Sequence, residues 1–386
     1  MRLGFVAGFV LSGLISAGVT AGELVPLVSS ASHVTGGWTS NATETPGGPS
    51  DTYVEHRHDI SFAGGQDGLA LRGRLSLSQT RFVSTDVAED EFGAGIEGEM
   101  LLAPGVTLRL GYALDHKQAT DGLPLGGGIL PVDSAETRQE VGGQVTVARG
   151  TETVTLSLVR EGLHFGPTRI GSLPPMRMTA DAGVTSLEAE WRHALGGGAL
   201  VLAGGRLRFT GVGEEDRLLF ERFPAHDLRM SFGLGSEGQG NIAALARGGL
   251  DVVWPDGRGD LAELQPFAEF LLEARFGGFA AALEAGTEIE LIDPVDGVAG
   301  TKRRLGIELV QALMPGLDAH GGFAHEREKG IYDPASFIEK TSLSAGLRYR
   351  PDTHWSYGLA VTRTGHSEQG LAYRKTDVAL TISGAI

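Results

Sequence analysis

The feature that most constrains this chain is a period-two alternation of apolar and polar residues, which recurs from residue 31 to the end. In the segment 69–78, leucines occupy one face of an extended strand and the other face carries Arg72, Arg74, Ser76 and Ser78. A period of two predicts β-strands, and helical spacing is largely absent. Many runs extend for about ten residues, longer than the roughly five or six that are typical of soluble sheets.

The connections between these runs differ in length in a regular way. Short turns are expected at 103–105, 149–150, 196–198, 238–240, 277–278, 314–316 and 350–352. Longer polar stretches lie between them, at 119–133, 166–181, 213–225, 255–261, 292–301, 328–339 and 365–369. Tight turns at one rim and longer loops at the other are typical of a transmembrane antiparallel up-and-down β-barrel, whereas a soluble sandwich has no reason to sort its loops.

Counting the alternating runs between these turns and loops predicts an all-β fold with eighteen strands, within a range of fourteen to eighteen. The expected spans are 31–43, 51–63, 68–83, 88–103, 105–118, 134–149, 151–165, 182–195, 199–212, 226–238, 240–254, 262–276, 278–291, 302–314, 316–327, 340–350, 353–364 and 370–386. Because the number is even, both ends of the chain are expected on the periplasmic side.

Residues 1–21 have the features of a cleavable signal peptide. Arg2 precedes an uncharged apolar stretch, and Val19-Thr20-Ala21 fits the small-x-small cleavage pattern, so cleavage is expected before Gly22. The alternative is a membrane anchor, but no basic stop-transfer cluster follows. The mature chain, 22–386, is expected to be a single barrel domain, since no later segment offers about eighteen consecutive apolar residues and only helices and closed barrels span lipid.

Composition narrows the function. The absence of cysteine excludes disulfides, thiolate metal sites and cysteine nucleophiles. A formal net charge of −16 disfavours a nucleic-acid partner, because the chain repels phosphate backbones. The 59 glycines and the mean hydropathy of −0.01 suit a chain in which only alternate residues face lipid.

Aromatic residues gather near the expected strand ends beside the short turns. They are Phe62, Phe276, Phe279, Tyr349, Trp355 and Tyr357. A girdle of aromatic side chains at the membrane interface is typical of transmembrane barrels, although aromatic residues also favour strands in general. The alternation in the last strand continues to Ile386.

With these features the chain resembles the porin-like outer-membrane β-barrel proteins of Gram-negative bacteria over residues 31–386. The opening segment 36–43 is similar to first strands of uncharacterised barrels of this kind. The resemblance implies an outer-membrane location, insertion by the barrel-assembly machinery, and contact with outer-membrane lipid and lipopolysaccharide. Two departures are the terminal Ile386, where such chains usually end in Phe or Trp, and the lack of a loop as long as the one that enters the lumen of general porins.

Motifs for catalysis or cofactor binding are weak. His56 and His58 share a strand face, which allows a two-histidine metal pair, but no third ligand is indicated. The sequence has no Gly-x-Ser-x-Gly elbow, HExxH or phosphate loop, and Gly126–Gly128 and Gly196–Gly198 are expected to be turns. The other histidines, such as His164, His226, His320, His325 and His366, are scattered. We therefore expect no enzymatic activity, no cofactor and no metal.

The polar strand faces carry the functional prediction. If the apolar faces meet lipid, the residues that line the lumen are Arg72, Arg74, Glu97, Glu99, Arg109, Glu188, Glu190, Arg192, Arg206, Arg208, Glu288, Glu290, Arg348 and Arg350. Charges of both signs maintain a wet channel and select between ions. Alternatively they pair and fill the barrel, but about sixteen to eighteen strands leave an aqueous channel.

Acidic residues are concentrated in the expected outer loops, at Asp86, Glu89, Asp90, Glu91, Glu214, Glu215, Asp216, Asp293 and Asp296. They are solvated, bind divalent cations shared with lipopolysaccharide, or bias entry toward cations. The resulting hypothesis is a channel for passive diffusion of small polar or charged solutes. The alternatives are a barrel that serves as an adhesin, a receptor or the anchor of an export assembly, and a soluble periplasmic β protein. Strands that begin near residue 31 leave no room for a plug domain, which argues against an energy-coupled transporter.

Overall fold

The chain forms a closed antiparallel β-barrel. The computed structural model describes residues 27–66, 68–125, 128–236, 241–257, 259–292, 294–368 and 371–385. The expected signal peptide, 1–21, and the terminal Ile386 lie outside the described residues. Successive strands pair with one another along the chain, and β1 (Leu27–Thr39) also pairs with β19 (Leu371–Ala385), so the sheet closes on itself.

Nineteen strands belong to the sheet, of which eighteen form the barrel wall. The remaining one, β8 (Arg169–Ile170), is a short strand that pairs with β6 inside a loop. The other wall strands are β2 (Asp51–Gln66), β3 (Leu69–Phe82), β4 (Ala88–Ala103), β5 (Val106–Leu125), β6 (Gly128–Arg149), β7 (Glu152–Phe165), β9 (Ala182–Gly196), β10 (Ala199–Gly211), β11 (Ala225–Ser236), β12 (Ile242–Pro255), β13 (Glu263–Phe276), β14 (Phe279–Glu290), β15 (Gly300–Met314), β16 (Leu317–Gly330), β17 (Phe337–Tyr349) and β18 (Trp355–Glu368).

The prediction of eighteen antiparallel strands in an up-and-down barrel is confirmed, and several boundaries are corrected. Residues 365–368, expected in a loop, belong to β18, and the expected loop 328–339 is reduced to 331–336 because β16 and β17 extend into it. The stretch 119–133, expected to be a loop, mostly continues β5 and β6, whose pairing runs from Val106 opposite Val147 to Leu125 opposite Gly128. Polar side chains link the two extended strands to each other: the Thr120 hydroxyl on β5 donates to Asp133 Oδ1 on β6 at 2.8 Å. The first strand ends at Thr39 rather than at residue 43, and residues 40–50 form a loop.

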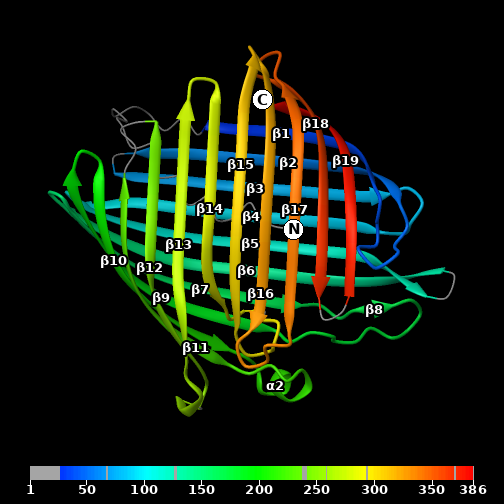
Figure 1. The fold of residues 1–386 in the computed structure, drawn as a ribbon, viewed down its shortest axis with the longest axis horizontal. Coiled ribbons are helices and arrows are strands. Elements are labelled where there is room, and N and C mark those ends of the chain that lie inside the picture. The colour runs from blue at the N-terminus through cyan, green and yellow to red at the C-terminus, as the bar shows by residue number, and fades with distance from the viewer. Residues whose placement is uncertain are drawn as a thin grey trace.

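The connections are sorted between two rims, as the sequence predicted. At the turn rim, strands join through tight turns in which glycine adopts a positive φ, such as Gly105 (77°) and Gly316 (78°). At the loop rim lie the longer segments 40–50, 166–181, 212–224, 256–257 with 259–262, 291–292 with 294–299, and 331–336. They include α2 (Glu214–Leu219) and the 3₁₀ turn η2 (Gly259–Leu261). Figure 1 shows that β2–β7 cross behind β12–β17 at a steep angle, as strand tilt in a barrel requires.

The outward faces of the wall are apolar and uncovered. On β7, Leu156 and Leu158 are 52% and 55% exposed, and most outward positions on the other strands are similar. Near the turn rim, Phe276, Tyr349, Trp355 and other aromatic side chains are exposed on the same outer surface. Lipid accounts for both features, since it covers apolar side chains and aromatic rings favour its interface. No helix among the described residues has the length and hydropathy needed to cross a membrane.

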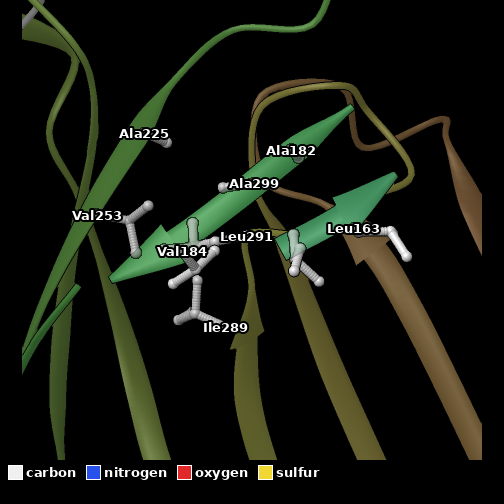
Figure 2. Packing of buried hydrophobic residues seen from close by; sticks show 9 residues of the cluster. Leu163, Ala182, Val184, Ala225, Val253, Ile289, Leu291 and Ala299 are labelled. Atoms are coloured by element: carbon white, nitrogen blue, oxygen red, sulfur yellow. The ribbon is translucent and has the colours of Figure 1, made fainter. Parts of the chain in front are cut away.

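The buried apolar residues lie at the loop rim. This apolar cluster consists of Leu163, Ala182, Val184, Ala225, Val253, Ile289, Leu291, Ile292 and Ala299. Figure 2 shows how residues from the ends of several strands converge with those of a loop. The largest apolar core in the described part of the chain therefore packs inside one end of the barrel.

The alternation of faces generates a test in one strand. We expect Leu156→Arg to destabilise the folded protein in lipid vesicles by about 2–4 kcal/mol, the usual loss for arginine facing the middle of a bilayer. The adjacent Ser157 faces the interior, opposite Glu188 on β9, so Ser157→Arg is the matched control and should leave stability nearly unchanged. Denaturant titrations of both variants measure the difference, and equal losses would contradict the assigned faces.

Candidate functional site: a charged and constricted lumen

Ion pairs between strands that are not neighbours identify the inner surface. Arg206 on β10 donates from Nη1 to Glu288 Oε1 on β14 at 3.2 Å, although β11, β12 and β13 separate these strands in the wall. Arg247 on β12 pairs in the same way with Glu190 on β9. Such contacts are possible only across the interior. They place Arg206, Glu190 and Glu288, three of the residues proposed from sequence, on the inner surface.

Asp227 on β11 is the centre of this charge network and is fully buried. Arg208 donates to it from Nε and Nη2, both at 2.8 Å, and Arg206 donates from Nη2 at 3.2 Å. A carboxylate that lacks water requires such paired donors, since an unpaired buried charge is strongly destabilising. The geometry therefore holds two arginines of β10 in fixed positions.

A second buried pair lies beside the first. Arg229 on β11 donates to Asp251 on β12 at 2.8 and 2.9 Å, and its guanidinium stacks 3.7 Å from the centre of the Phe267 ring. Our sequence prediction did not include Asp227, Arg229, Arg247 or Asp251. All four lie at alternate positions of the expected strands 226–238 and 240–254, and the alternation that identified the other lumen residues also applies to them.

The wall is interrupted between β13 and β14. Their pairing ends at Glu269 opposite Gly286, although both strands continue toward the loop rim. Pro266 lies beyond this point on β13 and has no N–H to offer a neighbouring strand. The Thr287 hydroxyl replaces part of the lost ladder, because it donates to the Pro266 carbonyl at 3.2 Å and accepts from the Ala268 N–H at 2.9 Å.

Beyond this interruption the end of β14 turns into the lumen. Ile289 and Leu291 are 2% and 0% exposed and pack with Val184 of β9 and Val253 of β12, in the apolar cluster of Figure 2. The Arg208 Nη2 also donates to the Ile289 carbonyl at 2.7 Å. We call residues 287–292 and 294–299 the inward segment. A strand end and its short loop therefore narrow the lumen, where the sequence had indicated only an outer loop at 292–301.

Neighbouring loops hold the inward segment in place. The buried Arg222 donates from Nη2 to the carbonyls of Leu291 and Ile292, the latter at 2.8 Å. The Asp296 carboxylate accepts backbone N–H groups from Val298, Ala299 and Tyr332 at 2.8–2.9 Å. These contacts satisfy the loop's polar groups within the protein, so the constriction is a defined part of the fold.

The hydroxyl of Tyr332 connects the loop 331–336, which holds the inward segment, to the end of β12 and to η2. Its oxygen lies 3.2 Å from the carbonyl oxygens of both Val253 and Leu261, so its single proton forms a bifurcated hydrogen bond to the two. Burial, followed by the negative charges of Glu263 and Asp296, raises the pKa of Tyr332 to about 12. The hydroxyl consequently keeps its proton, and thus its role as a donor, throughout the neutral range.

The charged side chains on β3, β4 and β5 are less deeply buried than Asp227, Asp251 and their arginine partners on β10–β12. Arg72 and Arg74 on β3 are exposed, and Arg109 on β5 pairs with Glu97 at 3.4 Å and Glu99 at 2.7 Å. Arg109 is only 25% exposed, close to the 26% of Arg304 on β15. The most deeply buried charges therefore lie on β10–β12, whereas Arg72 and Arg74 on β3 are accessible to water.

The remaining predicted lumen residues lie on the same alternation. Glu188 is directly opposite Arg206, and Arg192 pairs with Glu190. Glu290 accepts the Ile292 N–H at 2.9 Å within the inward segment. Near the turn rim, Arg350 pairs with Asp318, which is opposite Arg348.

The predicted acidic loops and the histidine pair have local structural partners. Glu89 and Glu91 lie in β4 rather than in a loop, and Lys117 pairs with both. Asp293 lies outside the described residues. His58 shares a 2.7 Å hydrogen bond with the Ser32 hydroxyl, and no group of three or more metal-binding side chains occurs in the part of the chain that the structure describes.

Comparison with known proteins relates the fold to outer-membrane barrels. The sequence matches no protein-family model and no curated protein. The structure is similar to the ferric enterobactin receptor PfeA of Pseudomonas aeruginosa, with TM-score 0.52 and 8% identity over 93% of this chain and 80% of that one. It is also similar to OccK2 (OpdF) of the same organism, in complex with glucuronate, with TM-score 0.50 and 11% identity over 94% and 98% of the two chains.

A third similar structure is the siderophore receptor PirA of Acinetobacter baumannii, with TM-score 0.51, 7% identity and coverage of 95% and 81%. At such low identity, these likenesses establish the fold alone. The chain has the fold of a porin-like outer-membrane β-barrel protein.

The buried network predicts a specific loss of stability. Replacing Asp227→Asn preserves side-chain shape but leaves Arg206 and Arg208 without their buried counter-charge, so we expect a loss of about 3–5 kcal/mol. The matched control is Asp90→Asn, which breaks the exposed pair with Arg81 and should lose about 1 kcal/mol or less. Urea unfolding in vesicles measures both, and similar small losses would contradict the importance of the network.

Proposed function

We propose that this protein is an outer-membrane channel for passive diffusion of small polar or charged solutes. The observation that carries the proposal is a closed barrel of eighteen wall strands with charged inner faces, on which Arg72 and Arg74 of β3 remain exposed to water. Barrels of about sixteen to eighteen strands enclose more space than side chains fill. No cofactor or catalytic group is needed for this role.

In this mechanism, solutes pass between the inward segment and the wall of β3–β5. The arginines of β10 and β11 are held by buried carboxylates toward the loop rim, while Arg72, Arg74 and the Arg109 cluster would line the passage nearer the turn rim. Fixed charges that line an aqueous passage orient dipolar solutes and favour ions of one sign. The fourteen residues predicted from sequence would thus set the rate by size and charge.

The fold and the sequence together support a location in the outer membrane. Outward apolar faces suit the outer membrane, and residues 1–21 would direct export as a signal peptide that leaves 22–386 as the mature barrel. Insertion would require the barrel-assembly machinery, and lipid with lipopolysaccharide would surround the wall. The similarity to OccK2, whose structure contains glucuronate, supports small charged solutes as the class to test first.

A second candidate is a barrel without an open pore, used as a receptor, an adhesin or the anchor of an export assembly. The inward segment and the cross-lumen pairs favour it, since they fill the part of the interior between β9 and β15. The similarity in fold to the receptor PfeA is compatible with it. Such a barrel would insert correctly and still carry no steady current.

Conductance in a planar bilayer distinguishes these functions. We expect the refolded mature protein to give stable, ohmic single-channel steps, with a cation preference in a salt gradient because acidic residues of the loop rim, such as the exposed Glu214 and Glu215, would shape entry. If protein that is inserted, protease-resistant and β-rich remains silent, the channel proposal is wrong and the receptor or anchor role takes its place.

The constriction provides a second test in the same experiment. Arg222→Ala removes the donors that hold Leu291 and Ile292, so we expect a larger and noisier conductance than in the native protein. Arg217→Ala is the control, because Arg217 is exposed on α2 in the same loop and should not affect the current. An unchanged conductance in Arg222→Ala would show that the inward segment does not limit passage.

A further inference from the structure

The outer surface of the wall contains a groove that the channel function does not use. It lies toward the loop rim over β5, β6, β7, β9 and β10 and has a volume of about 710 Å³. Its lining includes Tyr112, Arg160, His164 and Phe209. Strand register places these side chains on the outward face, since Arg160 is opposite Val141 and Thr185, and Phe209 is opposite Thr185.

A row of glycines forms the floor of the groove. Gly162 on β7 is directly opposite Gly183 on β9, which in turn is opposite Gly211 on β10. Because none of them has a side chain, three adjacent strands expose their backbone at the same height. The space is not required by close packing: a Cβ at Gly211 would meet no atom closer than 4.0 Å, and at Gly183 none closer than 3.4 Å.

The groove lies at the boundary of the apolar band. On each strand, the outward residue two positions closer to the turn rim than the glycine is Arg160, Thr185 or Phe209. Two positions further along, Leu158, Leu187 and Leu207 form an outward apolar row. In a membrane this boundary is the head-group level of the leaflet that faces the loop rim. The groove therefore opens to acyl chains below and to head groups at its own height.

The charges of the groove suit an anionic ligand. Arg160 is exposed on the outer face, while the half-exposed Tyr112 and Phe209 provide apolar ring surface nearby. The acidic residue that faces the groove, Asp181, is already bound, because it accepts the Phe165 N–H at 2.8 Å and lies 3.4 Å from His164 Nδ1 and 3.6 Å from Arg177 Nη2. Glu140, also part of the lining, lies on the inward alternation, opposite Glu161.

We propose that this groove is a binding site for a phosphorylated glycolipid of the outer leaflet. A lipid phosphate would pair with the Arg160 guanidinium, its sugar would occupy the glycine floor, and an acyl chain would run down past Phe209 to the leucine row. Arginine and phosphate form strong charge-assisted hydrogen bonds, and a side-chain-free floor admits a bulky head group. The site depends on the membrane orientation of the barrel and not on an open lumen.

Lipid binding by the full mature protein tests this site. Refolded protein in detergent micelles is titrated with lipid A, and binding is followed by native mass spectrometry, with phosphatidylglycerol and inorganic phosphate as competitors. We expect Arg160→Ala to weaken lipid A binding about tenfold or more, the loss typical of a charge-assisted hydrogen bond. Gly183→Val, which fills the floor, should weaken it similarly, and Gly211→Val serves if that variant does not fold.

Two controls are matched by position. Arg363 follows the outward Val361 on β18, away from the groove, so Arg363→Ala should bind lipid A normally. Gly205 lies on the outward face of β10 within the apolar band, and a Cβ there has room, so Gly205→Val should also behave as native.

Three results would overturn the proposal. The first is equal affinity of native protein and Arg160→Ala for lipid A. The second is equal competition by phosphatidylglycerol or inorganic phosphate, which would show that the groove does not select the glycolipid. The third is a stable oligomer of the native protein that Gly183→Val dissociates, since the groove would then be an interface between copies of this chain.

Discussion

The structure depends on one constraint: each backbone N–H and C=O of a wall that faces lipid must find its partner within the protein. The pairing of β1 with β19, from Ala31 opposite Ala385 to Thr39 opposite Asp377, meets this constraint by removing both edges of the sheet. Closure then determines the rest of the architecture. Once eighteen tilted strands form the wall, the interior is too wide for side chains of single strands to fill, and a second set of interactions must define it.

At the interruption between β13 and β14, backbone pairing in the wall gives way to packing in the interior. A strand edge left open toward lipid would be destabilising, and Pro266 shortens it by removing one donor while Thr287 bonds to two of the remaining groups. The freed end of β14 is then able to bury Ile289 and Leu291 against the inner faces of β9 and β12. Exchange of wall pairing for internal packing thus produces the constriction.

The pairing of charged side chains also depends on the inward turn of β14. In the half of the lumen that the inward segment narrows, arginine and carboxylate groups lose water and must pair, as Asp227 does with two arginines. On the β3–β5 wall, water remains and Arg72 and Arg74 are exposed. The lumen is therefore asymmetric, with fixed, paired charges beside the constriction near the loop rim and exposed arginines of β3 nearer the turn rim, and the proposed selectivity rests on this difference.

The strands, their faces and the sorting of turns and loops could be predicted from the sequence, because period-two alternation and glycine-rich turns are local properties of the chain. All eighteen wall strands lie near their expected spans, and the error at 119–133 arose where polar residues continue a ladder above the lipid band. Which charged side chains contact one another could not be predicted in this way, because it depends on the three-dimensional arrangement of the strands. Arg206 and Glu288 are far apart in sequence, and three strands lie between β10 and β14 in the wall. Their contact depends on barrel curvature and the inward turn of β14, neither of which has a local signal.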